Sequence, residues 1–374
     1  MNTSSTPKIE FVDLKAQYQA LKPLIDARIQ RVLDHGQFIM GPEVAELEAR
    51  LAQMSGAKHC ITCASGTEAL LIALMALDIK PGDEVITTPF TFIATAEVIV
   101  LLGAKPVYVD IEADTCNIDA RRIEEAITPR TRAVIPVSLY GQPADMDEIN
   151  AVCERHGVAV VEDAAQSFGS RYKGRWSGNL STIGCTSFFP SKPLGCYGDG
   201  GAMFTNDDRL AQAIREIRVH GQSKRYVHTR IGVGGRMDAI QCAVVLGKLD
   251  RFHWEVEQRQ RIGARYTQLL CELAPELQVL ALRPDRTNVY AQYTVRLRER
   301  AKIQQALQAA GIPTAVHYPI PIHRQPAYQN LQDGGSLSVS EQLANEVMSL
   351  PMHADLDSAT QDRIVAQIRS AVVI

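Results

Sequence analysis

Short apolar segments alternate with segments of helical periodicity between residues 59 and 205, and this alternation limits the fold more than any other feature. The predicted strands occupy residues 59–62, 84–87, 105–110, 132–137 and 158–161. Alternating strands and helices predict an α/β fold in which helices cover a largely parallel sheet. Ligands of such sheets bind beyond the carboxyl ends of the strands, so the residues that follow each strand are candidates for a functional site.

Two ionisable residues follow predicted strands. Residues 157–161 lead into Asp163, and a second apolar segment, 186–189, runs into Lys192. A lysine at one strand end and an aspartate at another are the two charges that hold pyridoxal 5′-phosphate (PLP). The lysine bonds to the aldehyde, and the aspartate keeps the pyridine nitrogen protonated, so that the ring can accept electrons. Taken singly, such an aspartate is often a helix cap and such a lysine part of a solvated loop. Their order and spacing favour the cofactor site.

Four further candidate ligands follow predicted strands. Ser65 is a predicted N-cap, and Gly66 allows close approach of a ligand, so the free amides around Gly66 and Thr67 can bind a phosphate. A plain capped helix is the alternative. Phe92 either stacks on the cofactor ring or packs in the core. Ser187 lies at the end of its strand, and all of these residues converge on one edge of the predicted sheet.

The length of 374 residues allows two domains. We predict a large domain over residues 1–250, with a loose N-terminal arm at residues 1–12 followed by a helix, and a small C-terminal α/β domain over residues 251–374. Residues 238–250 are predicted to be helical and to continue as one long helix toward residue 272.

Composition argues against several classes of function. The net charge of −3 offers no basic field for nucleic acid, and the longest nearly apolar run, 93–104, is too short to cross a membrane. The first residues lack the apolar core of a signal peptide, so we expect a cytoplasmic location with reduced thiols. Cys60 and Cys63 form a lone C-x-x-C without a second pair at zinc spacing, so a buried strand is predicted there and no metal site.

The segment 222–236 is polar and basic, with Lys224, Arg225, His228, Arg230 and Arg236. A charged loop is most often a solvated face, and these residues alone favour that interpretation.

Several motifs together resemble those of a known family, the DegT/DnrJ/StrS family of PLP-dependent nucleotide-sugar aminotransferases, which has the fold of aspartate aminotransferase (fold type I). The resemblance covers residues 9 to 355 and rests on Gly41-Pro42-Glu43, Ser65-Gly66-Thr67-Glu68-Ala69-Leu70, Pro81-Gly82-Asp83-Glu84-Val85-Ile86, Glu162-Asp163-Ala164-Ala165-Gln166-Ser167, Ser187-Phe188-Phe189-Pro190-Ser191-Lys192, Gly198-Asp199-Gly200-Gly201 and His317-Tyr318-Pro319.

The resemblance implies a role for each candidate residue. Lys192 becomes the cofactor-bound lysine and the proton shuttle, and Asp163 the partner of the pyridine nitrogen. Gln166 contacts the 3-hydroxyl of the ring, and Phe92 stacks on it. The phosphate is held by Gly66, Thr67 and Ser187. The family is dimeric, and the loop around residues 220–236 reaches the neighbour's active site. The substrate ligands implied there are Arg236, His317 and Tyr318.

One position departs from the family pattern, which usually has Gly-x-Asn-x-Arg with the asparagine reaching the phosphate in the other subunit. Here Gly232-Val233-Gly234-Gly235-Arg236 places glycine at the asparagine position. Glycine has no side-chain amide to make this contact across the subunits, so a backbone amide or a water is its expected replacement.

Within the family, residues 138–142 and 190–201 resemble most closely the enzymes that aminate C3 of UDP-2-acetamido-2-deoxy-3-oxo-glucuronate for lipopolysaccharide O-antigen sugars. The resemblance implies L-glutamate as the amino donor. The alternative is a 4-aminotransferase acting on a neutral UDP- or dTDP-4-ketosugar. Related dehydratases carry histidine at the position of Lys192, and a regulatory protein of this fold would have no need of Lys192 together with Asp163.

Overall fold

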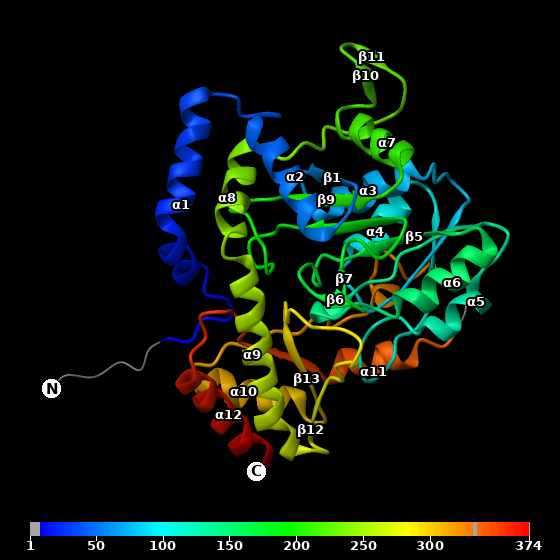
Figure 1. Ribbon diagram of the computed structural model, residues 1–374. Coiled ribbons are helices and arrows are strands. Elements are labelled where there is room, and N and C mark those ends of the chain that lie inside the picture. Colours follow the sequence, from blue (N-terminus) through cyan, green and yellow to red (C-terminus); the bar gives the residue numbers. More distant parts are fainter. Residues whose placement is uncertain (1–7, 332–334, 374) are drawn as a thin grey trace.

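The structure is a computed structural model that describes residues 8–331 and 335–373 (Figure 1). Its main sheet has seven strands in the order β1-β9-β8-β5-β4-β2-β3. Neighbouring strands from β8 to β3 run parallel, whereas β9 is antiparallel to both β8 and β1. This confirms the predicted α/β class with a mixed, mostly parallel sheet. The strands are β1 (His59–Cys63), β2 (Glu84–Thr87), β3 (Lys105–Tyr108), β4 (Thr131–Val134), β5 (Ala159–Asp163), β8 (Ile183–Ser187) and β9 (Gly201–Thr205).

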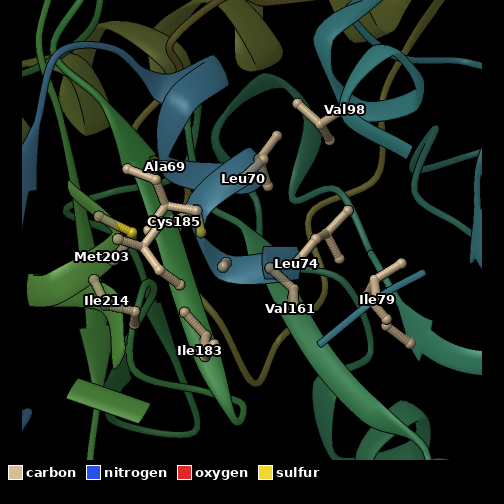
Figure 2. Packing of buried hydrophobic residues seen from close by; sticks show 14 of the residues in the cluster. Ala69, Leu70, Leu74, Ile79, Val98, Val161, Ile183, Cys185, Met203 and Ile214 are labelled. Carbon is tan, nitrogen blue, oxygen red and sulfur yellow. The ribbon is translucent and has the colours of Figure 1, made fainter. Parts of the chain in front are cut away.

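Helices cover both faces of this sheet because its strands are apolar on both sides. On one face, Leu70 and Leu74 of α3 lie over Val161, Ile183 and Met203 of the strands (Figure 2). Helices α4 and α7 complete that layer, and α2, α6 and α8 cover the opposite face. The bounds are α2 (Pro42–Ser55), α3 (Gly66–Ala76), α4 (Ala94–Leu101), α6 (Met146–His156), α7 (Asp208–Arg218) and α8 (Ala239–Leu249).

The C-terminal part forms a second, antiparallel sheet in the order β12-β13-β14, with its own apolar core. Its elements are α9 (Phe252–Leu270), β12 (Leu277–Val279), β13 (Tyr293–Leu297), α10 (Arg300–Ala309), α11 (Ser338–Glu346), β14 (Val347–Leu350) and α12 (Ser358–Val373). The domain boundary near residue 250 stays a prediction. The remaining elements are α1 (Leu14–His35), α5 (Ile123–Ala126), β6 (Arg171–Tyr172), β7 (Arg175–Trp176), β10 (Gln222–Lys224) and β11 (Val227–His228).

Two local predictions are wrong in detail. The long helix predicted from residue 238 toward 272 is divided into α8 and α9, with Asp250 and Arg251 between them. The arm was predicted to be loose, but Ile9 is buried in the core of the second sheet and the N–H of Met352 donates to the carbonyl oxygen of Phe11 at 3.0 Å. Residues 1–7 of the arm lie outside the described residues. Within the described ranges, no helix is both long and apolar enough to cross a membrane.

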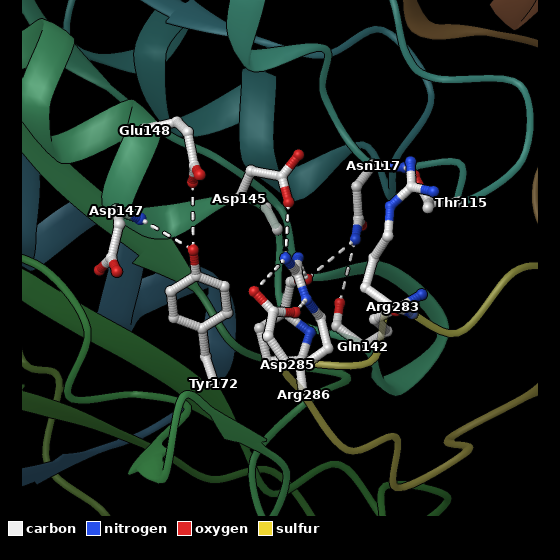
Figure 3. Close-up of polar contacts among 12 residues, drawn as sticks. Thr115, Asn117, Gln142, Asp145, Asp147, Glu148, Tyr172, Arg283, Asp285 and Arg286 are labelled. Atoms are coloured by element: carbon white, nitrogen blue, oxygen red, sulfur yellow. Dashed lines mark hydrogen bonds and ion pairs between the residues drawn. The ribbon is translucent and has the colours of Figure 1, made fainter.

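Polar contacts fasten the segment before β13 to the large sheet (Figure 3). Arg286 contacts the carboxylates of Asp145 and Asp285, each at 2.7 Å. Arg283 pairs with Glu112 at 2.9 Å. The pairs with Asp145 and Glu112 join loops of the large sheet to the chain that enters the second sheet, so they help to set how the two sheets lie around the site.

Candidate active site

A cavity of about 470 Å³ lies at the carboxyl ends of β5 and β8. Asp163 is the last residue of β5 and Ser187 the last residue of β8, so the strand-end rule accounts for their convergence. The walls contain every predicted site residue except Arg236, namely Gly66, Thr67, Phe92, Asp163, Gln166, Ser187, Lys192, His317 and Tyr318.

Asp163 is a buried carboxylate with a hydrogen bond on each oxygen. Its Oδ1 accepts the N–H of Ala165 at 3.2 Å, and its Oδ2 accepts the hydroxyl of Thr95 at 3.0 Å. Burial raises the pKa of Asp163, whereas these two donors and the charge of Lys192 act in the opposite direction. A buried anion is stable only when it is hydrogen-bonded and paired, so the carboxylate fits a protonated pyridine nitrogen as its partner.

Lys192 follows β8 and lines the same cavity as Asp163. Its backbone N–H donates to the carbonyl oxygen of Phe189 at 2.8 Å, which shapes the turn that carries it. Burial lowers the pKa of Lys192 to about 8, and the charge of Asp163 opposes this effect. A lysine with a pKa near neutrality has an appreciable unprotonated fraction, which is the form that attacks an aldehyde and accepts a proton.

The start of α3 forms a cradle that fits a phosphate. Ser65 Oγ accepts the N–H of Glu68 at 3.0 Å, which confirms the predicted N-cap. A Cβ atom on Gly66 would lie 2.6 Å from Cβ of Ser187, so only glycine permits this approach of the helix to β8. The amides of the first turn and the Ser187 hydroxyl bound the same cavity, and the positive end of a helix favours an anion there.

Gln166 and Tyr318 form the opposite wall. Gln166 Oε1 accepts the N–H of Tyr140 at 2.8 Å, and its Nε2 donates to the hydroxyl of Tyr318 at 3.1 Å. An amide nitrogen has two hydrogens, so one remains for a ligand such as the ring 3-hydroxyl. Phe92 is 55% exposed and faces Tyr318 with ring centroids 6.2 Å apart, which excludes core packing and fits stacking on a bound ring.

His317 enters the cavity from the C-terminal part of the chain. Its Nδ1 lies 3.0 Å from Ser349 Oγ, and that hydroxyl lies 2.8 Å from Thr294 Oγ1. Burial and the charge of Lys192 lower the pKa of His317 to about 4, so the imidazole is neutral at pH 7. A neutral imidazole held at Nδ1 can offer Nε2 to a polar group of a substrate.

Arg236 does not line this cavity. It is half-buried in the loop after β11, and its Nε has no hydrogen-bond partner among the described residues. The carbonyl oxygen of the preceding Gly235 accepts the N–H of Ala64 at 3.0 Å, which ties the loop to the chain just before α3. The predicted substrate role of Arg236 stays a prediction.

Three residues of the site were missed. Thr95 contacts Asp163, Tyr140 contacts Gln166, and Ser349 contacts His317. The spacing of Thr91 and Thr95 is helical and hinted at a shared helix face. Tyr140 lies in the segment 138–142 whose resemblance to the family was noted, but nothing there indicated a contact with Gln166. No sequence signal marks Ser349, because its contact with His317 joins residues far apart along the chain.

Comparisons with known proteins agree with this geometry. The chain matches the DegT/DnrJ/EryC1/StrS aminotransferase family over residues 19–369. It is 57% identical to a UDP-2-acetamido-2-deoxy-3-oxo-D-glucuronate aminotransferase of Pseudomonas aeruginosa, covering 96% of this chain and 99% of that protein. A solved aminotransferase of the same family from Brucella abortus has a TM-score of 0.94 at 42% identity, covering 97% of this chain and 99% of that one.

The solved structures also bear on the cofactor and the fold. The structure of ntda from Bacillus subtilis, with bound cofactor PMP, has a TM-score of 0.93 at 30% identity, covering 100% of this chain and 87% of that one. These likenesses confirm the predicted fold of PLP-dependent aminotransferases. The residues around the cavity supply a lysine, a buried carboxylate and a phosphate cradle, which are the groups that PLP requires. The chain therefore belongs to the DegT/DnrJ/EryC1/StrS family of PLP-dependent aminotransferases.

Proposed function

We propose that the protein transfers the amino group of L-glutamate to C3 of UDP-2-acetamido-2-deoxy-3-oxo-D-glucuronate, a step in lipopolysaccharide O-antigen sugar biosynthesis. The reaction class is supported by one observation: Lys192, Asp163 and the phosphate cradle at Gly66 all line the same cavity. The specific sugar is supported by the 57% identity with the Pseudomonas aeruginosa enzyme named for that substrate.

The side chains of the cavity account for the proton transfers. PLP, when bound, supplies a ring that stores the electrons of a carbanion. Asp163 holds the charge of the pyridine nitrogen, and the amides at Gly66 anchor the phosphate. Lys192 Nζ, with its pKa lowered to about 8, takes the proton from the α-carbon of glutamate and returns a proton to C3 of the sugar. Glutamate leaves as 2-oxoglutarate before the ketosugar enters the same cavity, so ping-pong kinetics are expected.

We also propose a homodimer with shared active sites. Lys192 is the only lysine or arginine among the described residues that line the cavity, although the cofactor phosphate, the diphosphate and the uronate are all anions. The β10–β11 hairpin projects from the body of the molecule (Figure 1), and Tyr226 in its turn and Ile231 after it are 79% and 85% exposed. A partner that receives this basic loop would bury these side chains and gain the missing cations.

A cytoplasmic location is part of the same proposal. All eight cysteines are free thiols, which suits a reducing compartment. The direct test of the proposed function is product NMR after incubation with glutamate and either the 3-oxo-uronate or a neutral 4-ketosugar. An amine at C3 of the uronate is expected, whereas an amine formed at C4 of the neutral sugar would support the alternative substrate.

Arg236 is expected to bind the C6 carboxylate of the sugar from the neighbouring subunit. Arginine presents a planar fork that matches a carboxylate, so Arg236→Gln should raise the KM for the uronate roughly 10- to 100-fold, as for the loss of charge-assisted hydrogen bonds. The glutamate half-reaction should stay nearly intact, because sugar binding alone is lost. Stopped-flow measurement of each half-reaction, together with steady-state KM values, checks this.

The matched control for Arg236 is Arg230, an arginine of the same loop whose Nε already pairs with Glu216 at 2.8 Å. Arg230→Gln should leave the KM for the uronate within about threefold, in the range of ordinary surface substitutions. A neutral hexose analogue should lose much less than the uronate in Arg236→Gln. Equal losses with both sugars would point instead to an ion pair between subunits as the role of Arg236.

Gly234 is expected to tolerate the asparagine that the family usually has. Its φ is not in the left-handed region, and a Cβ atom there would lie 3.0 Å from the exposed ring of His220 and 3.9 Å from Nη2 of Arg236. Gly234→Asn should slow the loss of PLP, because the asparagine can add one hydrogen bond to the charged phosphate. Such a bond stabilises binding by up to about 1.5–3 kcal/mol. Dialysis against buffer without PLP measures this, with Gly234→Ala as the control that adds Cβ but no amide. Equal or faster loss would mean that the backbone already anchors the phosphate.

A further inference from the structure

The carboxylate of Asp163 has one side-chain hydrogen-bond donor among the described residues, and that donor is Thr95. Thr95 lies in the first turn of α4 and is 1% exposed. Its hydroxyl is 3.0 Å from Asp163 Oδ2, and the second contact of the carboxylate is the backbone N–H of Ala165 on Oδ1. Among the described residues, Thr95 is therefore the one side chain whose hydrogen bond can change the proton affinity of this buried carboxylate.

The hydroxyl of Thr95 is in turn within hydrogen-bond distance of a second hydroxyl, that of Thr91. Thr91 Oγ1 lies 3.1 Å from Thr95 Oγ1, and Thr91 is 4% exposed. A hydroxyl has one proton, and an ionised carboxylate can only accept. The proton of Thr95 must therefore point to Asp163, and Thr91 must donate to Thr95. Both hydroxyls thus align toward the carboxylate, and each bond strengthens the next by polarisation.

The position of a proton between Asp163 and a pyridine nitrogen depends on the proton affinity of each group. Burial increases the affinity of Asp163 for a proton, and a donor on Oδ2 decreases it. Without that donor, a proton shared between Asp163 and the pyridine nitrogen would move toward Asp163, and the ring would become neutral. A neutral pyridine accepts electrons poorly, so the benefit of the carboxylate would be lost although its position is unchanged.

We infer that Thr95, with Thr91 behind it, is a positioning residue that orients the Asp163 carboxylate and keeps it in its anionic form against the cofactor ring. The inference rests on the proposed PLP chemistry. It assigns a function to the hydroxyl of Thr95 itself, not to the packing of α4. Other titratable groups that face Asp163 are Lys192, Tyr318 and Cys185, and none of these is altered in the test below.

The test compares Thr95→Val, which keeps the shape but deletes the hydroxyl, with Thr95→Ser, which keeps the hydroxyl. Each holoenzyme is reconstituted with PLP labelled with ¹⁵N in the ring, and the NMR shift of that nitrogen reports its protonation. We expect the signal of Thr95→Val to move toward neutral pyridine, whereas Thr95→Ser stays at the wild-type value. The rate constant of the glutamate half-reaction should fall about tenfold in Thr95→Val, the equivalent of one pKa unit, and recover in Thr95→Ser.

Two outcomes would overturn the inference. An unchanged nitrogen signal in Thr95→Val would mean that the hydroxyl does not affect the ring, and equal losses in both variants would mean that packing matters instead. If Thr95→Val does not fold, Thr91→Val removes the donor to Thr95 and should shift the signal in the same direction by a smaller amount; no shift there contradicts the inference. A neutral ring in the wild-type enzyme would also contradict the inference, whereas a wild-type enzyme that binds no PLP would instead contradict the proposed function.

Discussion

Lys192→Ala is expected to abolish transamination while the fold survives. The variant loses the amine that bonds to the cofactor and also the base that moves the proton at the α-carbon of glutamate. Acid–base catalysis by one side chain alone contributes roughly 10²–10⁴-fold, so the total loss should be about 10⁴-fold or more. Single-turnover measurement with glutamate and thermal unfolding of the same sample check both parts of the expectation.

Lys248 offers a matched control for this experiment. It is 3% exposed, its Nζ has no hydrogen-bond partner among the described residues, and burial lowers its pKa to about 8, as for Lys192. It lies under the ring of Tyr197, with Nζ 4.4 Å from the ring centroid, and does not line the cavity. Borohydride reduction of the PLP-loaded protein followed by peptide mapping should label Lys192 alone. Label on Lys248 would mean that a low pKa, and not the position beside Asp163, selects the lysine.

Asp163→Asn is the second variant with a large expected effect. Asparagine preserves the size of the side chain but removes the charge that stabilises a protonated pyridine nitrogen. Loss of such a preorganised electrostatic contact typically costs roughly 10²–10³-fold in rate. The rate constant of the glutamate half-reaction should fall by that factor, and PLP should still bind through the cradle at Gly66. Stopped-flow absorbance of the cofactor measures both the rate and the bound fraction.

Glu162 is the natural control because it precedes Asp163 in β5 and points to the opposite side of the strand. Its Oε1 accepts the hydroxyl of Ser177 at 2.7 Å and its Oε2 the N–H of Gly178 at 2.9 Å, both outside the cavity. Glu162→Gln replaces a buried carboxyl group by an amide of the same size, as Asp163→Asn does, but should leave the half-reaction rate within about threefold. A comparable loss in both variants would show that any charge removed from β5 is harmful, and that Asp163 has no special role.

Much of this protein was predictable from local patterns. Strands buried on both faces are continuous apolar runs, so the sheet was visible in the sequence, and the strand-end rule then brought Asp163, Ser187 and Lys192 to one edge. The N-cap at Ser65 was likewise predictable, because capping is a matter of residues three apart. These features depend on contacts within one element or on a general rule of parallel sheets.

Other features were decided only by the tertiary structure. The hydrogen bond from Thr95 to Asp163 and the contact of Ser349 with His317 join residues far apart in the chain, and neither hydrophobic period nor turn chemistry specifies such a pairing. The arm was predicted to be loose, yet Ile9 is buried in the core of the second sheet. That core forms only when β12 to β14 have assembled. The sequence by itself determined which residues carry the chemistry, because charge and residue type are local properties. Tertiary packing decided which hydroxyls and backbone groups hold them, because a hydrogen bond forms only where two distant segments are brought within about 3 Å.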